Sequence, residues 1–181
     1  MEYHPDPFLV ELIHYNNWAN AQILAACQNL TEEQLDASAP GVYGPIRDTL
    51  LHMLWAEADY VGRITGDRPY PATFGRGQQP TLADLTTFAA PVAEALLNTV
   101  QRVPPDQIVH EEEDGNTMDY QARLLYLQVI NHGIEHRTNV TTILSSLGVT
   151  APEIDGWGYL SAHPKEFALK ETFREGPNAD H

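Results

Sequence analysis

Two histidines, His132 and His136, are the residues whose type and spacing point most directly to chemistry. They interrupt a stripe of apolar residues at steps of three and four, where a core helix normally carries leucine. Residues four apart share one face of a helix, with Cβ atoms about 5–6 Å apart, so two ring nitrogens can bind one metal ion. Buried imidazoles can instead form ordinary hydrogen bonds with neighbours. The spacing alone leaves both interpretations open.

A metal ion needs at least a third ligand, and periodicity does not choose it. His52 lies in the middle of a second helical pattern. The strongest apolar arc of that pattern, through Leu50, Leu54 and Val61, is on the opposite side of the helix. His52 is therefore expected to be partly exposed or to lie between helices. The remaining histidines are at positions 4, 14, 110, 163 and 181.

Four long stretches carry the apolar period of a helix and predict an all-α fold: residues 8–30, 46–64, 82–103 and 120–148. Residues 66–80 are rich in Pro and Gly and predict an irregular connection, longer than the roughly 2–8 residues that usually join antiparallel helices. A small hairpin is predicted within 107–118, and a short helix within 159–169.

The bulk composition bounds the class of protein. The 181 residues fit a single domain over 1–181, with an ordered core over about residues 6–170. Ten Lys and Arg against 25 Asp and Glu give a net charge of −15, which disfavours nucleic acid and anionic membranes as partners. No apolar run reaches the roughly 18–20 residues of a membrane span.

The N-terminal residues lack the pattern of a secretory signal, and the single Cys27 suits a reducing compartment, so a cytoplasmic protein is expected.

Four motifs, in their order and spacing, together resemble the DinB family. They are YNNWAN at 15–20, IRDTLLH with WAEADY at 46–60, HGIEHR at 132–137 and LSSLG at 144–148. The resemblance covers most of the chain and implies a four-helix bundle of up-down-down-up connectivity, with residues 66–80 as the long crossover between the second and third helices. It also implies one divalent metal ion, zinc or nickel, held by three histidines that match His52, His132 and His136. Where the family often continues its His-Arg pair with Gly-Gln, this chain has Thr138 and Asn139. A homodimer is a further expectation from the family.

Two functions of different classes follow from such a site. Three histidines leave coordination positions open for water or a thiolate, which predicts a metal-dependent enzyme with a small-molecule substrate. Relatives with known activity include S-transferases that use bacillithiol or mycothiol, so a low-molecular-weight thiol is a candidate cosubstrate and hydrolysis a second reaction of the same site. The alternative is a metal-binding sensor or interaction module without catalysis.

Three carboxylates are candidates for acid–base help: Glu57, Asp59 and Glu135. Glu135 also completes the H-x-x-E-H pattern of inverzincin proteases, but it is rotated about 100° from the following histidine, and so short a pattern arises easily by chance. Asn16 and Asn20 lie on the inward face of the first helix. They are expected either to line the pocket or to make buried structural hydrogen bonds.

Overall fold

The computed structural model describes residues 3–69, 79–113 and 115–167. Over these residues the chain is mostly helical, with one small antiparallel sheet of two strands. The all-α prediction is confirmed in this coarse form, and so is the small hairpin before the last long helix. Residues 70–78, within the predicted connection, and residues 168–170, at the end of the expected ordered core, lie outside the described residues.

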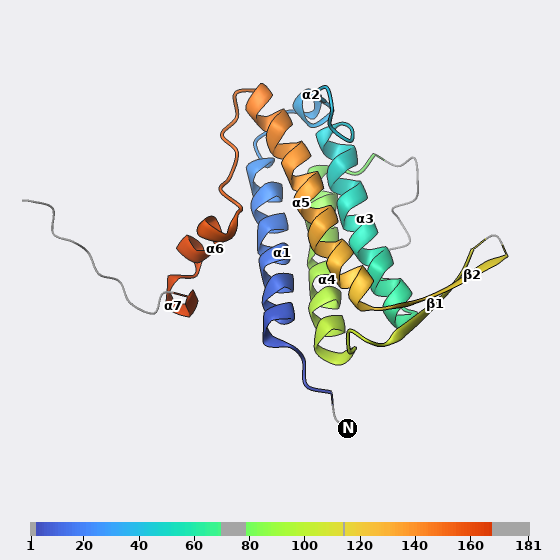
Figure 1. Ribbon diagram of the computed structural model, residues 1–181. Helices are drawn as coiled ribbons and strands as arrows, with labels where there is room; N and C mark the ends of the chain where they lie inside the picture. Colours follow the sequence, from blue (N-terminus) through green and yellow to red (C-terminus); the bar gives the residue numbers. More distant parts are fainter. Residues whose placement is uncertain (1–2, 70–78, 114, 168–181) are drawn as a thin grey trace, which may run out of the picture.

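Four long helices pack side by side (Figure 1). They are α1 (Pro7–Ala26), α3 (Ile46–Thr65), α4 (Leu82–Arg102) and α5 (Arg123–Ser146). Helix α3 contacts both α4 and α5, and α1 contacts the same two helices. Their apolar side chains turn inward, and burying each large one contributes about 1.5–3 kcal/mol. None of the helices in the described ranges is long and apolar enough to cross a membrane.

The first helix is shorter than its apolar pattern predicts. A one-turn helix, α2 (Glu32–Leu35), follows α1 and was not expected from periodicity. Thr31 Oγ1 accepts a hydrogen bond from the Gln34 N–H, and the Gln34 side chain accepts one from the Thr31 N–H. This capping box begins a new helix, so the preceding helix must end upstream of it.

A hairpin joins α4 to α5 and extends from one end of the helices (Figure 1). Strand β1 (Ile108–Glu113) pairs antiparallel with β2 (Asn116–Gln121). Gly115 in the turn has φ +78°, a left-handed conformation that glycine adopts without steric cost. The last long helix starts a few residues later than predicted because Tyr120 is paired with Val109 in the sheet.

Two short helices near the end of the described chain are α6 (Gly156–Ala162) and α7 (Pro164–Phe167). The Tyr159 hydroxyl donates a hydrogen bond to the Glu11 carboxylate and so ties α6 to α1. The short helix predicted within 159–169 overlaps these two helices up to residue 167, and its last two residues lie outside the described part.

Candidate metal centre

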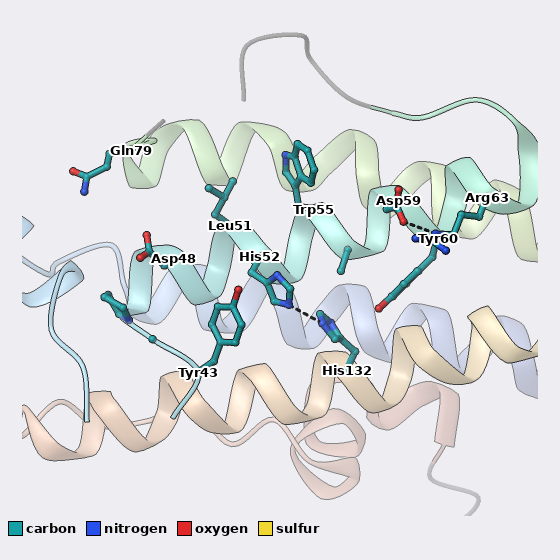
Figure 2. A pocket seen from close by; sticks show the side chains of 13 residues that line it. Tyr43, Asp48, Leu51, His52, Trp55, Asp59, Tyr60, Arg63, Gln79 and His132 are labelled. Atoms are coloured by element: carbon teal, nitrogen blue, oxygen red, sulfur yellow. Dashed lines mark hydrogen bonds and ion pairs between the residues drawn. The ribbon is translucent and has the colours of Figure 1, made fainter. Parts of the chain in front are cut away.

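Three imidazole rings meet between α3 and α5. His132 Nε2 lies 3.1 Å from His52 Nε2 and 3.1 Å from His136 Nε2. Each ring can offer one nitrogen to a common ion, and the three nitrogens all lie within 4.8 Å of one another. Figure 2 shows His52 of α3 and His132 of α5 pointing toward each other.

The two helices contribute their histidines in different ways. On α5, His132 and His136 are one turn apart on the buried face, 8% and 4% exposed. His52 lies on the half-buried side of α3, opposite the arc that packs into the core. The packing of α3 against α5 therefore brings a half-buried ring against two buried ones.

A cluster of hydrogen bonds does not account for this arrangement. A neutral imidazole Nε2 carries one proton or presents one lone pair, so His132 Nε2 can make only one good bond although it has two close neighbours. Zinc lies about 2.0–2.1 Å from histidine nitrogens, which puts the ligands of a tetrahedral site about 3.3–3.4 Å apart. The observed separations of 3.1 Å are close to that spacing. The three histidines fit a divalent metal ion.

Burial favours the neutral form of each ring. The pKa of His132 is lowered to about 4, first by burial and then by the neighbouring His136 and His52. The pKa values of His52 and His136 are also lowered, in both cases mainly by burial. A neutral imidazole presents the lone pair that binds a metal.

The second nitrogens of the buried rings have little polar support. In the described part of the chain, Nδ1 of His132 and Nδ1 of His136 have no hydrogen-bond partner, whereas metal-bound histidines usually donate this N–H to a carboxylate or carbonyl. The ring of Tyr43 packs against two of the three histidines instead. Tyr43 stacks on His52 with ring centroids 4.4 Å apart and meets His136 edge-on at 5.0 Å.

Tyr43 comes from the loop before α3, and α5 holds that loop in place. The Tyr43 backbone N–H donates to Oδ1 of Asn139 at 3.0 Å, and Asn139 Nδ2 donates to the Glu135 carbonyl at 2.7 Å. Asn139 is one of the two positions at which this chain departs from the Gly-Gln that often follows the family's His-Arg pair. The Asn139 side chain, which differs from the usual family residue, thus links α5 to Tyr43, the residue that stacks on His52.

Two of the histidines, His52 and His132, border a cavity of about 1160 Å³ (Figure 2). Small-molecule sites are usually about 300–1,000 Å³, so the volume suffices for a substrate together with a cosubstrate. One face of α3 lines much of it, over about 22 Å of helix. Its lining residues on that face include Asp48, Leu51, His52, Trp55, Asp59 and Arg63.

A buried polar network joins α1, α3 and α5. Asn16 Nδ2 and Asn20 Nδ2 donate to the Glu57 carboxylate at 2.7 and 2.9 Å. Arg137 Nη1 donates to Oδ1 of the same two asparagines at 2.8 and 2.6 Å. Burial raises the pKa of Glu57, while the amide donors and Arg137 oppose that rise. Because arginine stays protonated, the two amides connect a buried cation to a buried carboxylate.

Gly133, between the two histidines of α5, leaves space for this network. A Cβ atom at this position would lie 2.6 Å from Asn16 Oδ1 and 2.7 Å from Arg137 Nη1. Real Cβ contacts are not that short, so any larger residue would displace the buried polar groups. The glycine therefore lets α5 approach the asparagine of α1.

The five other candidate residues lie in three settings. Asn16 and Asn20 each donate a hydrogen bond to Glu57, and none of the three is among the described residues that line the large cavity. Asp59 lines the cavity and is ion-paired with two arginines. Glu135 is exposed on α5.

Three residues that were not singled out from the sequence also line the cavity: Tyr43, Asp48 and Tyr60. The ring of Tyr60 lies 6.0 Å from that of His132. Asp48 and Tyr60 lie four before and eight after His52, so their shared face could have been read from helical spacing. Tyr43 lies in a loop, where no period indicates its neighbours.

The fold and the site define a helical protein with three histidines that could hold one metal ion beside a cavity of substrate size. A family model described as DinB family matches residues 1–170. The chain belongs to the DinB family, as the sequence motifs indicated. A search of curated proteins found no match.

Proposed function

We propose that this protein is a metal-dependent enzyme that acts on a small-molecule substrate as a thiol S-transferase or a hydrolase. His52, His132 and His136 would bind one divalent ion, zinc or nickel. The observation that carries the proposal is the convergence of three imidazoles at a large cavity, which His52 and His132 themselves line.

The number of ligands supports a catalytic site. Catalytic zinc sites typically have three protein ligands and keep a position for water or substrate, whereas structural sites use four. Among the described residues, no fourth His, Cys, Asp or Glu joins the group. A divalent metal bound there would act as a Lewis acid and lower the pKa of a water or thiol ligand toward neutrality.

The side chains around the site have distinct proposed roles. Asp59 has the best access among the three acid–base candidates because it lines the cavity, and its 2.5 Å ion pair with Arg63 Nε orients its carboxylate. Glu57 is proposed to anchor the buried network, through which Asn16 and Asn20 hold α1 against α3. Glu135 is exposed on α5 and is not among the described residues that line the cavity, so we propose no role for it in the chemistry.

A metal-binding sensor or interaction module without catalysis is the alternative. It would use the same three histidines, but it would not need a cavity of about 1160 Å³ beside them. The cavity therefore favours the enzyme.

Metal content tests the proposed ligands. Elemental analysis of the purified protein is expected to find one divalent ion per chain, and His52→Ala and His132→Ala are expected to lose most of it. His110→Ala is the matched control, because His110 lies on the exposed hairpin, bonded to Asp119. Unchanged metal content in both site variants would refute the site.

Turnover separates the two classes of function. The metal-loaded protein is incubated with a chromogenic electrophile or ester in the presence of bacillithiol, of mycothiol, or of no thiol. Thiol-dependent turnover that a chelator abolishes is expected of an S-transferase, and thiol-independent turnover of a hydrolase. Metal binding without turnover in any arm would favour the sensor, and turnover that survives chelation would contradict metal catalysis.

Three further proposals concern the connectivity of the helices, the location of the protein in the cell and its oligomeric state. We propose that the long helices are connected up-down-down-up, which is supported by the position of α2 at one end of the helices and of the β1–β2 hairpin at the other (Figure 1). We propose a cytoplasmic location, which the single, buried and unpaired Cys27 supports. The homodimer expected from the family is also a proposal, and light scattering of the purified protein tests it.

A further inference from the structure

The charged groups along the cavity are paired at one end and unpaired at the other. Asp59 forms ion pairs with Arg63 and Arg68, and Arg63 also pairs with Glu111. Asp48 is exposed and has no hydrogen-bond or ion-pair partner among the described residues. Among the described lining residues, Arg63 is therefore already neutralised, whereas the Asp48 carboxylate is not.

Asp48 lies close to the histidine group. It is four residues before His52 on the same face of α3, so their Cβ atoms are about 5–6 Å apart. Figure 2 shows Asp48 before His52 along α3, and both residues are among those that line the cavity. A molecule whose reactive atom reaches the histidines, and whose body extends toward the start of α3, would lie near the Asp48 carboxylate.

The start of α3 would otherwise attract anions. A helix N-terminus carries a partial positive charge of about half an elementary charge. Asp48 lies in the first turn of α3 and offsets that charge with a full negative one. The net charge of −15 on the whole chain adds a field of the same sign.

We propose that the cavity selects a thiol cosubstrate whose body is uncharged or positively charged, and disfavours one whose body carries carboxylates, with Asp48 as the residue that discriminates. The inference rests on the proposed thiol chemistry of the histidine site. The metal would attract the thiolate sulfur of any thiol, so discrimination must come from the body of the molecule. Of the two thiols named above, mycothiol has an uncharged body, whereas bacillithiol carries a dicarboxylate that outweighs its single ammonium group, so mycothiol is the expected partner.

Three small thiols with the same two-carbon spacer test the inference: cysteamine, 2-mercaptoethanol and 3-mercaptopropionate. Their tails are cationic, neutral and anionic. Binding to the cobalt(II)-loaded protein is followed through the visible absorption of the cobalt ion. Because the thiols differ in intrinsic affinity for metal, each one is compared between the wild type and Asp48→Asn.

The expected effect follows from Coulomb's law. At about 6 Å in a water-like dielectric, one pair of unit charges changes a binding constant about threefold. The ratio of cysteamine to mercaptopropionate affinity should therefore fall about tenfold in Asp48→Asn, and about tenfold again in Asp48→Lys. High salt should reduce both changes. Mycothiol should bind more tightly than bacillithiol to the wild type, and Asp48→Lys should narrow the difference.

A control variant and two contrary outcomes distinguish a failure of charge selection by Asp48 from a failure of the proposed thiol site. Glu33→Gln removes the same charge from an exposed position on α2 that does not line the cavity, and should leave the ratio unchanged. If all three thiols bind but the ratio is unchanged in both Asp48 variants, or shifts equally in Glu33→Gln, selection by Asp48 is wrong and the thiol site stands. If none of the thiols alters the cobalt spectrum, the proposed thiol chemistry itself is wrong.

Discussion

Replacing Gly133 by alanine should destabilise the protein, although alanine is the better helix former. Gly133 is buried in α5, and a Cβ atom there would lie 2.6 Å from Asn16 Oδ1 and 2.7 Å from Arg137 Nη1. These two atoms form a hydrogen bond of 2.8 Å between buried side chains. The added methyl group must therefore separate the guanidinium from its acceptor or push α5 away from α1.

The magnitude is the balance of three effects. Gly to Ala within a helix gains about 1 kcal/mol of intrinsic propensity. Forcing an extra carbon into a packed interior costs about 1–3 kcal/mol, and losing a buried hydrogen bond to a charged group costs about 1.5–3 kcal/mol. The free energy of unfolding should therefore fall by roughly 1.5–5 kcal/mol, and a value of about 3 kcal/mol corresponds to a melting temperature about 6–12 °C lower.

Urea denaturation followed by circular dichroism measures this effect. Both proteins are studied after chelation, because a metal bound to the folded state would add its own stability. Gly156→Ala is the matched control, because a Cβ atom at Gly156 meets nothing within 4 Å. It should change the free energy of unfolding by less than about 1 kcal/mol. A Gly133→Ala variant as stable as the wild type would show that the guanidinium and Asn16 do not pack against this turn of α5.

Three further predictions concern the buried network, the cysteine and the Tyr43 loop. Glu57→Gln leaves the Arg137 guanidinium buried without a carboxylate and should cost about 3–5 kcal/mol in denaturation experiments, and wild-type stability would contradict an ionised pair. Burial raises the pKa of Cys27 to about 12, so iodoacetamide should label it in urea but not in the folded protein at about pH 8, as judged by mass. Asn139→Ala removes the acceptor of the Tyr43 N–H and should speed hydrogen exchange at that amide while changing global stability by less than about 1 kcal/mol. Asn139→Asp keeps an acceptor and should exchange like the wild type, and equal exchange in both variants would argue against this contact.

The four long helices could be located from the sequence because an amphipathic helix repeats its apolar residues every three to four positions. The ends of these helices could not be predicted as well, because they depend on hydrogen bonds that do not appear in the apolar periodicity. The capping box at Thr31 begins α2, and the pairing of Tyr120 with Val109 delays α5. Both signals are short-range, and the Thr31-x-x-Gln34 pattern could have been recognised in the sequence.

The sequence by itself determined that His132 and His136 share a face, because residues four apart on a helix do so whatever surrounds them. It also placed Asn16 and Asn20 on the inward face of the first helix. Only the tertiary structure decided what these residues meet. His52 is 80 residues from His132 along the chain, and the packing of α3 on α5 brings their Nε2 atoms to 3.1 Å. Backbone geometry within a helix is local and repeats, whereas the distance between two helices depends on all the side chains packed between them.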